Sequence, residues 1–491
     1  MTNVSSTQPL RQILAWGLPA SITLSYLIPG LQSDLRSSFP ALIGITSLIM
    51  ALIGVTLYAG TRGLIDWSPE VIILVSVILR IIFLFTPPQL SDDIYRYLWD
   101  GLQVLNGQNP YSAAPLKARL PNDAAYNLLQ LMNHPDLGTI YPPAAQVIFA
   151  AGAYLGAGFL GFKALLVLMD SISCVLIVKL LSRAGLPAWQ AVVYAWHPLP
   201  ILEIASSGHI DGAGILFLFL TLALLQALSP ERSTREDPSR RPESRPRRHI
   251  FIAMSAGFTF ACAVLVKLFP LIFLPGMFIL AGKRFRAPFL AGIAAGVFTL
   301  TIPFLPDIKN AFSVLNTYIL NWEFAGFAFR TLRRITSSGY SARLILASFF
   351  IIFAAVRYRK LLLEVRHTVQ YSDRDRCLPS PGDGRFLAVM ETFCHITMAF
   401  LFLTPTLHPW YALYLVCFLP FAPEVAGLML TWSVLLSYRV LVTKALLGQW
   451  IEDDFTPLLI WSAPVCAWIL AALAGKLKRQ LAFILNSHLM W

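Results

Sequence analysis

The sequence predicts an all-α fold, a polytopic transmembrane helical bundle of about 13–14 spans with a large outer-face loop that carries membrane-parallel helices. Of the 491 residues, 56% are hydrophobic and only 13% are charged, and the mean hydropathy is +0.65. A soluble protein carries about 25% charged residues. Apolar runs of about 20 residues, long enough to cross a hydrocarbon core, recur along the chain. The strand alternation of a membrane barrel does not occur.

The apolar runs predict fourteen spans, which lie at 13–30, 40–60, 71–87, 163–183, 187–203, 211–228, 250–265, 268–282, 286–305, 341–357, 386–404, 409–422, 424–446 and 457–475. The first run lacks a small-residue cleavage site, so we expect a retained span and not a signal peptide. The run at 144–158 is also apolar. As a full span it would place the Arg-rich loop 229–249 outside, so we expect a half-inserted helix on the outer face.

These spans form one domain, residues 1–475, followed by a tail at 476–491. Within it we expect extra N-terminal spans in 1–70, a first outer loop at 88–162 and a second outer loop at 306–340. With the N-terminus in the cytoplasm, Lys and Arg are twice as frequent in the inside segments as in the outside ones, as the positive-inside rule requires. This bias accounts for most of the net charge of +12 without a nucleic-acid partner.

The basic loop 229–249 is rich in Arg, Ser and Pro and is predicted to be a disordered cytoplasmic segment that touches anionic lipid. The six cysteines are scattered without a C-x-x-C pair, so neither a disulfide framework nor a metal site is predicted. No phosphate-binding G-x-x-x-x-G-K-[ST] segment is present, which argues against a mechanism driven by cytosolic nucleotide.

The first outer loop opens with two adjacent acids, Asp92 and Asp93. The spacing i, i+3, i+4, i+7 predicts one helix face formed by Asp93, Arg96, Tyr97 and Asp100. A helix start capped by Ser91 explains an acid here, but not two acids and an arginine beside the bilayer. A carboxylate at this position can act as general base on an acceptor hydroxyl or hold a divalent cation.

Other polar residues fall at outer turns. His209 and Asp211 form either a polar turn or part of a site. Lys267 either snorkels to headgroups or neutralises a lipid phosphate. His408 stands beside Trp410 and Tyr411, a pair typical of membrane interfaces. In the loop 306–340, Glu323 precedes the basic residues Arg330, Arg333 and Arg334, which indicate an anionic headgroup or phosphate. Asp170, in mid-span, is predicted to be a structural carboxylate paired within the bundle.

Seven segments between about 85 and 425 occur in a characteristic order: Asp92-Asp93-Ile94-Tyr95-Arg96-Tyr97 with Asp100, Asn109-Pro110-Tyr111, Tyr141-Pro142-Pro143, His197-Pro198-Leu199-Pro200, Ser207-Gly208-His209-Ile210-Asp211, Lys267-Leu268-Phe269-Pro270 and His408-Pro409-Trp410-Tyr411. In these the chain resembles the GT-C superfamily of membrane glycosyltransferases. It is most similar to the polyprenol-phosphate-mannose-dependent type, which includes the first mannosyltransferase of GPI-anchor synthesis and bacterial relatives.

The resemblance implies transfer of a hexose, mannose above all, from a polyprenyl-phosphate donor to a lipid-linked or glycan acceptor, with inversion and an Asp base. It implies a bacterial inner membrane with the site facing the periplasm. In such families the acidic motif follows the first span, whereas here it follows the third. The acids are also adjacent and not spaced, which leaves open whether Asp92 or Asp93 is the base.

We therefore assign catalysis to Asp92 and Asp93. The expected donor-phosphate ligands are Arg96, Lys267, His408 and Arg333. The expected substrate contacts are Tyr97, Asp100, Tyr141, His209, Asp211, Glu323, Trp410 and Tyr411. No metal ligand or cofactor is assigned, although paired acids are compatible with a divalent cation. The expected partners are the polyprenyl-phosphate-sugar donor, the acceptor and membrane lipid, without nucleic acid.

Three alternatives remain open from the sequence. A transporter or flippase for a lipid-linked sugar would account for intramembrane charges, but inverted repeats are not evident and few charges lie at mid-span. An enzyme similar to O-antigen ligases or lipid A-modifying enzymes would share the outer-face chemistry with a pyrophosphate-linked donor. The third alternative is a non-catalytic assembly factor.

Overall fold

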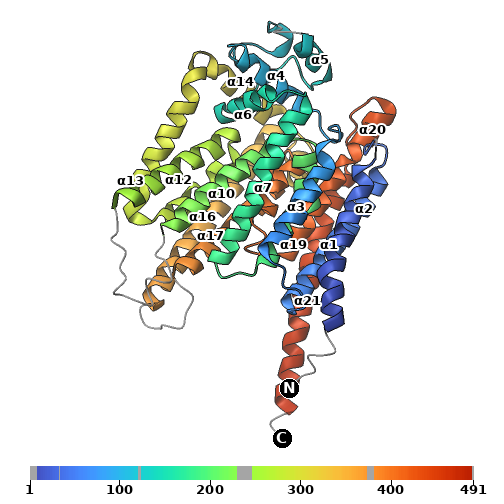
Figure 1. Ribbon diagram of the computed structural model, residues 1–491, viewed down its shortest axis with the longest axis vertical. Helices are drawn as coiled ribbons and strands as arrows, with labels where there is room; N and C mark the ends of the chain where they lie inside the picture. Colours follow the sequence, from blue (N-terminus) through green and yellow to red (C-terminus); the bar gives the residue numbers. More distant parts are fainter. Residues whose placement is uncertain (1–7, 33, 120–122, 229–245, 373–380, 489–491) are drawn as a thin grey trace.

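The computed structural model describes residues 8–32, 34–119, 123–228, 246–372 and 381–488. Over these residues the chain is built of helices without a β-strand (Figure 1), and two isolated bridges join Phe324 and Ala325 to Thr406. This confirms the predicted all-α bundle. Of the predicted basic loop 229–249, residues 229–245 lie outside the described residues, and 246–249 begin a helix.

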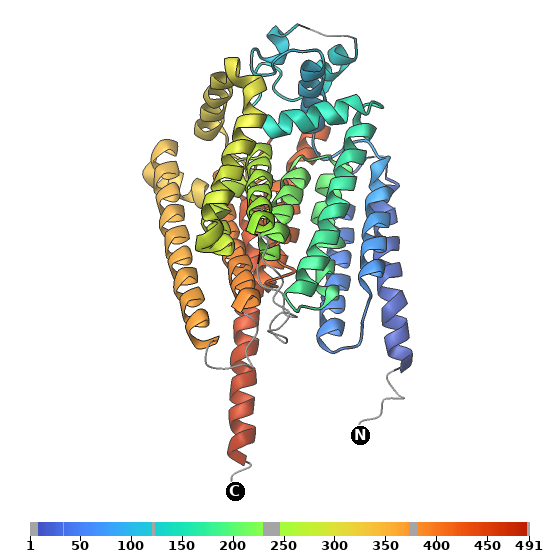
Figure 2. The same cartoon turned by 60° about the vertical axis from the view of Figure 1, so that its left-hand side comes forward.

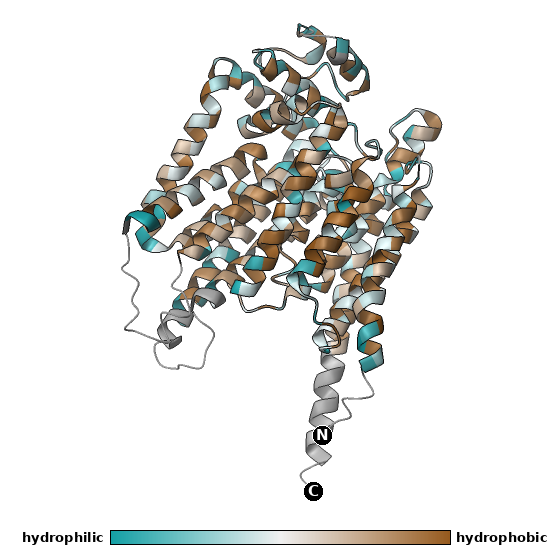
Figure 3. Ribbon diagram, in the orientation of Figure 1, coloured by the Kyte–Doolittle hydropathy of each residue, from teal (hydrophilic) through white to brown (hydrophobic). Residues whose placement is uncertain are grey.

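The helices of the main bundle lie side by side, and all but α19 and α20 are long (Figure 1). They are α1 (Gln8–Gly30), α2 (Phe39–Thr61), α3 (Pro69–Leu84), α7 (Phe159–Arg183), α10 (Asp211–Ala227), α12 (Pro246–Val266), α13 (Leu274–Thr301), α16 (Gly339–Ser372), α17 (Pro381–Leu403), α19 (Val425–Ser433), α20 (Arg439–Leu447) and α21 (Phe455–His488). Apolar residues dominate their length (Figure 3). The last helix continues beyond the predicted domain end at residue 475.

Among the described residues, fewer helices are long and apolar enough to span a membrane than the predicted 13–14. Nine described segments are long and apolar enough to cross a membrane, or ten if Pro198–Ser206 and Asp211–Gln226, bent by 117°, form one broken span. Two predicted spans are instead short broken segments: 187–203 holds η3 (Ala188–Ala191), α8 (Val192–Ala195), α9 (Pro198–Pro200) and the start of η4 (Ile201–Ser206), and 409–422 holds η8 (Pro409–Ala412) and α18 (Leu413–Val416).

These two regions are apolar because they are buried inside the protein and not because they face lipid. Prolines at 198, 200 and 409 lack the N–H that a continuous helix needs. The runs 268–282 and 286–305 were predicted as separate spans. The structure places a break between them, at Gly282 with φ +67° inside α13, a conformation that glycine adopts without strain.

One end of the bundle is capped by shorter helices. These are α4 (Asp93–Leu105), η2 (Pro115–Lys117), α5 (Asp123–Leu131), α6 (Pro143–Tyr154), η7 (Ile302–Asp307) and α14 (Ile308–Asn321). In Figures 1 and 2, α6 lies across the top of the bundle and not along it, as expected for the 144–158 run. Helix α1 begins at the opposite end (Figure 2).

A fully buried ion pair holds the bundle below this cap. Arg80 of α3 donates from Nε to Asp170 Oδ2 of α7 at 2.7 Å, and neither side chain is exposed. Arg80 Nη1 also donates to the Ala195 carbonyl at 2.9 Å, and the Tyr194 hydroxyl donates to Asp170 Oδ1. The prediction that Asp170 is paired within the bundle is confirmed, and the pair ties the broken segment 187–203 to two long helices.

Candidate active site

A cavity of about 1100 Å³ lies beneath the cap. Ten of the sequence-predicted site residues line it: Asp92, Asp93, Arg96, Tyr141, Asp211, Lys267, Glu323, His408, Trp410 and Tyr411. Three others, Tyr97, Asp100 and His209, are buried in the surrounding structure. Arg333 is not part of the lining. The tertiary fold therefore gathers most of the candidates, which come from six separate segments, around one cavity.

The two adjacent acids stand at the start of α4. Asp92 is the N-cap residue but makes no side-chain capping bond, and Asp93 begins the helix. The Ser91 hydroxyl accepts from the Asp93 backbone N–H at 3.3 Å. Both carboxylates are consequently free of the capping role that such residues commonly take, and both line the cavity.

The surroundings of the two acids differ sharply. Asp92 binds two cations: Arg36 Nη2 lies 2.8 Å from Oδ1 and Lys444 Nζ lies 3.1 Å from Oδ2. Asp93 has no Lys or Arg partner within ion-pair distance among the described residues. Its Oδ2 accepts from the Tyr97 hydroxyl at 3.5 Å and lies 3.8 Å from His209 Nδ1.

The pKa of Asp93 differs from that of an ordinary carboxylate. Burial raises its pKa to about 6; the charge of Lys267 opposes this shift, and those of Asp92 and Asp211 add to it. Its side chain is still 28% exposed, so it can meet a substrate. A carboxylate that ionises near neutral pH and faces a cavity has the properties of a general base.

The rest of the predicted helix face supports the cavity wall. Arg96 pairs with Asp100, 3.0 Å between Nε and Oδ1, and donates from Nη1 to the Leu137 carbonyl at 3.1 Å. Tyr97 stacks on Phe149 with ring centroids 4.6 Å apart. The Arg96–Asp100 pair and the Tyr97 stack thus fix α4 against the loop 137–141 and α6, while Asp93 is left facing the cavity.

An aromatic wall faces the acids. His209, Trp410, His408 and Phe324 form a stack of four rings, with successive centroids 4.0, 4.2 and 4.6 Å apart. Burial, and then the charge of Lys267, lowers the pKa of His408 to about 3. His408 is therefore neutral at physiological pH and would meet a phosphate by hydrogen bonding, without a charge of its own.

Lys267 lies beside this aromatic wall and also lines the cavity. Its Nζ lies 2.7 Å from Asp211 Oδ1 and 4.7 Å from the ring centroid of Tyr411. The Tyr411 hydroxyl in turn shares a hydrogen bond of 2.8 Å with the Tyr318 hydroxyl of α14. Because the Asp211 carboxylate balances the charge of Lys267, the two side chains together present a dipole to the cavity and not a net positive charge.

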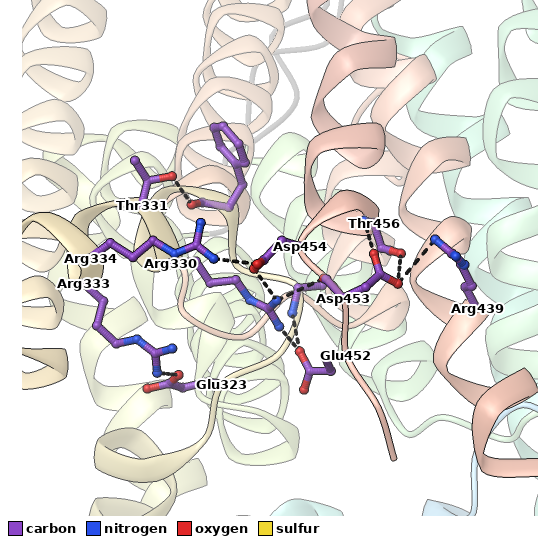
Figure 4. Close-up of polar contacts among 12 residues, drawn as sticks. Glu323, Arg330, Thr331, Arg333, Arg334, Arg439, Glu452, Asp453, Asp454 and Thr456 are labelled. Carbon is purple, nitrogen blue, oxygen red and sulfur yellow. Dashed lines mark hydrogen bonds and ion pairs between the residues drawn. The ribbon is translucent and has the colours of Figure 1, made fainter. Parts of the chain in front are cut away.

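The arginines of α15 (Phe327–Thr336) are paired with acids (Figure 4). Arg330 pairs with Glu452, and Arg334 lies 2.6 Å from Asp454. Arg333, 47% exposed, pairs with Glu323. The predicted phosphate ligand Arg333 thus lies outside the cavity and already has a partner, because an acidic run at 452–454 and Glu323 neutralise this helix.

Arg36 and Lys444 are cavity cations that sequence reasoning missed. Arg36 lies in a segment predicted to be outside and Lys444 near the end of the predicted span 424–446, but no local motif marks either one. They are 56 and 352 residues from Asp92, so only the tertiary fold brings them together. No cluster of three or more His, Cys, Asp or Glu side chains suited to a metal ion occurs in the described part of the chain.

One comparison with known proteins is informative. A family model, MptA_B family, described as alpha-(1->6)-mannopyranosyltransferase, N-terminal domain, matches residues 7–283. This range is more than half of the chain, and it contains Arg36, Asp92, Asp93, His209 and Lys267. No curated protein and no solved structure matches the chain.

Proposed function

The chain belongs to the MptA_B family of alpha-(1->6)-mannopyranosyltransferases, and we propose that it moves mannose from a polyprenyl-phosphate donor to a hydroxyl of a lipid-linked or glycan acceptor. The family makes it a mannosyltransferase, and the apolar helices make it a multi-pass membrane protein. The observation that carries the proposal is the contrast between Asp93, which lacks a cationic partner, and Asp92, which has two, at the edge of one cavity.

We assign the general base to Asp93. A base must be ionised and free to accept a proton, and a carboxylate held by two cations is a poorer acceptor than one that is not. With a pKa of about 6 Asp93 is ionised above that pH, and among the described residues it has no Lys or Arg partner that would hold its carboxylate. Asp92 would instead orient Arg36 and Lys444.

The donor phosphate is assigned to Arg36 and Lys444. A departing phosphate gains negative charge, so it needs cations and not an acid. The two cations share one carboxylate, which leaves a surplus positive charge, whereas Lys267 and Arg96 are each balanced by one acid. Lys267 and His408 would contact the sugar or phosphate from the opposite wall.

The lipid part of the donor fits the apolar side of the cavity. Phe269, Ile272, Val314, Leu315 and Phe400 line it there. In an inverting displacement the acceptor oxygen attacks the anomeric carbon opposite the phosphate, so an α-linked product requires a β-configured donor. The predicted charge bias supports an outward orientation of the capped end of the bundle, which in a bacterium would be the periplasmic face of the inner membrane.

Purified protein in nanodiscs tests the proposal. Radiolabelled polyprenyl-phosphate-mannose and an α-mannoside acceptor should give a product whose label is released by an exo-α-mannosidase. The Asp93→Asn variant is the negative control. Intact wild-type protein that yields no labelled product would refute mannosyl transfer from this donor. Movement of the donor across liposome membranes without transfer would favour the flippase alternative.

A further inference from the structure

A second set of ionisable side chains lies directly behind Asp93. His209 Nδ1 is 3.8 Å from Asp93 Oδ2, and His209 Nε2 is 3.4 Å from Glu203 Oε2. His209 and Glu203 are fully buried. Neither ring nitrogen makes a hydrogen bond of good geometry in the described structure. A phenyl ring would fill the same space as this buried imidazole. The choice of histidine between two carboxylates therefore points to a chemical role.

The backbone is shaped to hold His209 there. Glu203 lies in the π-helix η4, and such single turns are frequent at functional sites. The His209 N–H donates to the Glu203 carbonyl at 2.9 Å. Gly208, with φ +77°, lets this turn approach α4 closely, since a Cβ there would stand 2.6 Å from Ile94 Cδ1.

The neighbours of His209 restrict its ring. Its stack on Trp410 fixes the ring plane, so the two nitrogens keep their separate partners. The Tyr438 hydroxyl lies 2.7 and 2.8 Å from the two Glu203 carboxyl oxygens. It can donate to only one of them, so the other is free to accept from His209. The remaining charged or titratable groups near His209 are Lys267 and His408. Asp211 follows His209 by two residues along the chain.

We propose that His209 is a positioning residue for the transfer reaction, with its Nε2–H directed at Glu203 and its Nδ1 lone pair held ready for Asp93. The inference rests on the proposed function. As the acceptor oxygen bonds to the anomeric carbon and the carbon–phosphate oxygen bond breaks, the acceptor proton passes to Asp93. The new Asp93 O–H then donates to His209 Nδ1. After product release, Asp93 returns this proton to water in the cavity.

The distance of 3.8 Å between Asp93 Oδ2 and His209 Nδ1 fits this role while Asp93 is ionised. An ionised Asp93 and an imidazole lone pair repel one another, so no hydrogen bond forms until Asp93 is protonated. Catalytic hydrogen bonds are often long before the substrate binds. Glu203, through its hold on Nε2–H, selects the tautomer, as a carboxylate does for a catalytic histidine in other enzymes.

The pH dependence of kcat/KM tests the assignment. A bond to the protonated form raises the pKa of Asp93, so His209→Phe should lower the midpoint by about 0.5–1 pH unit, the equivalent of one net hydrogen bond. It should lower kcat by about tenfold with KM little changed. In His209→Asn the side-chain oxygen replaces Nδ1, so this variant should recover part of the lost kcat and part of the shift in the midpoint. Glu203→Gln should shift the midpoint in the same direction as His209→Phe.

His395→Phe is the matched control, since His395 contacts Arg357 and Glu391 and does not line the cavity. Wild-type kcat and midpoint in folded His209→Phe would overturn the inference and leave the proposed function intact. If that variant fails to fold, His209→Asn and Glu203→Gln decide: an unchanged midpoint in both overturns it. Failure of the wild type to transfer mannose would instead overturn the proposed function.

Discussion

Replacing Asp93 with asparagine should lower the rate of mannosyl transfer and leave the free energy of unfolding nearly unchanged. The change keeps the shape of the side chain but removes the proton acceptor. Loss of a general base lowers the rate by about 10²–10⁴-fold, which corresponds to about 2.7–5.4 kcal/mol of activation free energy. Asp93 makes no ion pair with Lys or Arg among the described residues and is 28% exposed. The free energy of unfolding should therefore change by less than about 1 kcal/mol.

Asp92→Asn is the matched comparison, since it alters the adjacent carboxylate. It removes the shared partner of Arg36 and Lys444, which are 29% and 34% exposed on their side chains. Partly exposed pairs contribute about 1 kcal/mol or less each, so a small loss of stability is expected. Because the cations remain in the cavity, kcat should fall by less than about tenfold.

Initial rates with radiolabelled donor and thermal unfolding in detergent, measured on the same preparations, distinguish the two variants. A slow but stable Asp93→Asn protein beside an active Asp92→Asn protein supports the assignment. The reasoning is refuted if Asp93→Asn turns over at the wild-type rate, or if only Asp92→Asn loses activity.

Further predictions concern pH and packing. The wild-type kcat/KM should rise with pH through about 6 and level off above it, because Asp93 acts when deprotonated; a flat profile between pH 5 and 8 contradicts this. Lys267→Met should move the midpoint upward, since the lysine charge opposes the raised pKa of Asp93. Gly208→Ala should lower the unfolding free energy by about 1–3 kcal/mol through its positive φ and close contact, and an unchanged melting temperature would count against it. Arg80→Met leaves the buried Asp170 without a cation and should lower the free energy of unfolding by about 3–5 kcal/mol. Thermal unfolding measures this loss, with Arg62→Met, which changes an exposed arginine, as the control.

The sequence predicted best what depends on local spacing. The helix that begins at Asp93 followed from the i, i+3, i+4, i+7 spacing of Asp93, Arg96, Tyr97 and Asp100, and the helix lying across the cap followed from charge bias. The number of spans was overestimated because hydropathy measures apolarity alone. It does not separate a lipid-facing helix from a broken segment such as 187–203, in which residues 191–203 are buried within the protein.

The cationic part of the site was harder to predict. Arg333 was expected to bind phosphate because basic residues are rare on the outer face, yet an acid already neutralises it. The acidic run 452–454 was a signal of such pairing that the sequence offered. Arg36 and Lys444 had no comparable signal, since their common partner Asp92 is far from both along the chain.

The cavity wall divides along the chain in a way that bears on diversification. The acids, Lys267, Arg36 and the Asp93–His209–Glu203 row all fall before residue 283. The aromatic surface opposite them, with Tyr318, Phe324, Trp410 and Tyr411, comes from after it. The general base and the row behind it can thus be altered separately from the aromatic surface, whereas the two cavity cations are divided, with Arg36 in the earlier part and Lys444 in the later part. Grafting the later half of a relative onto this earlier half should change which acceptor is glycosylated and leave the general base in place.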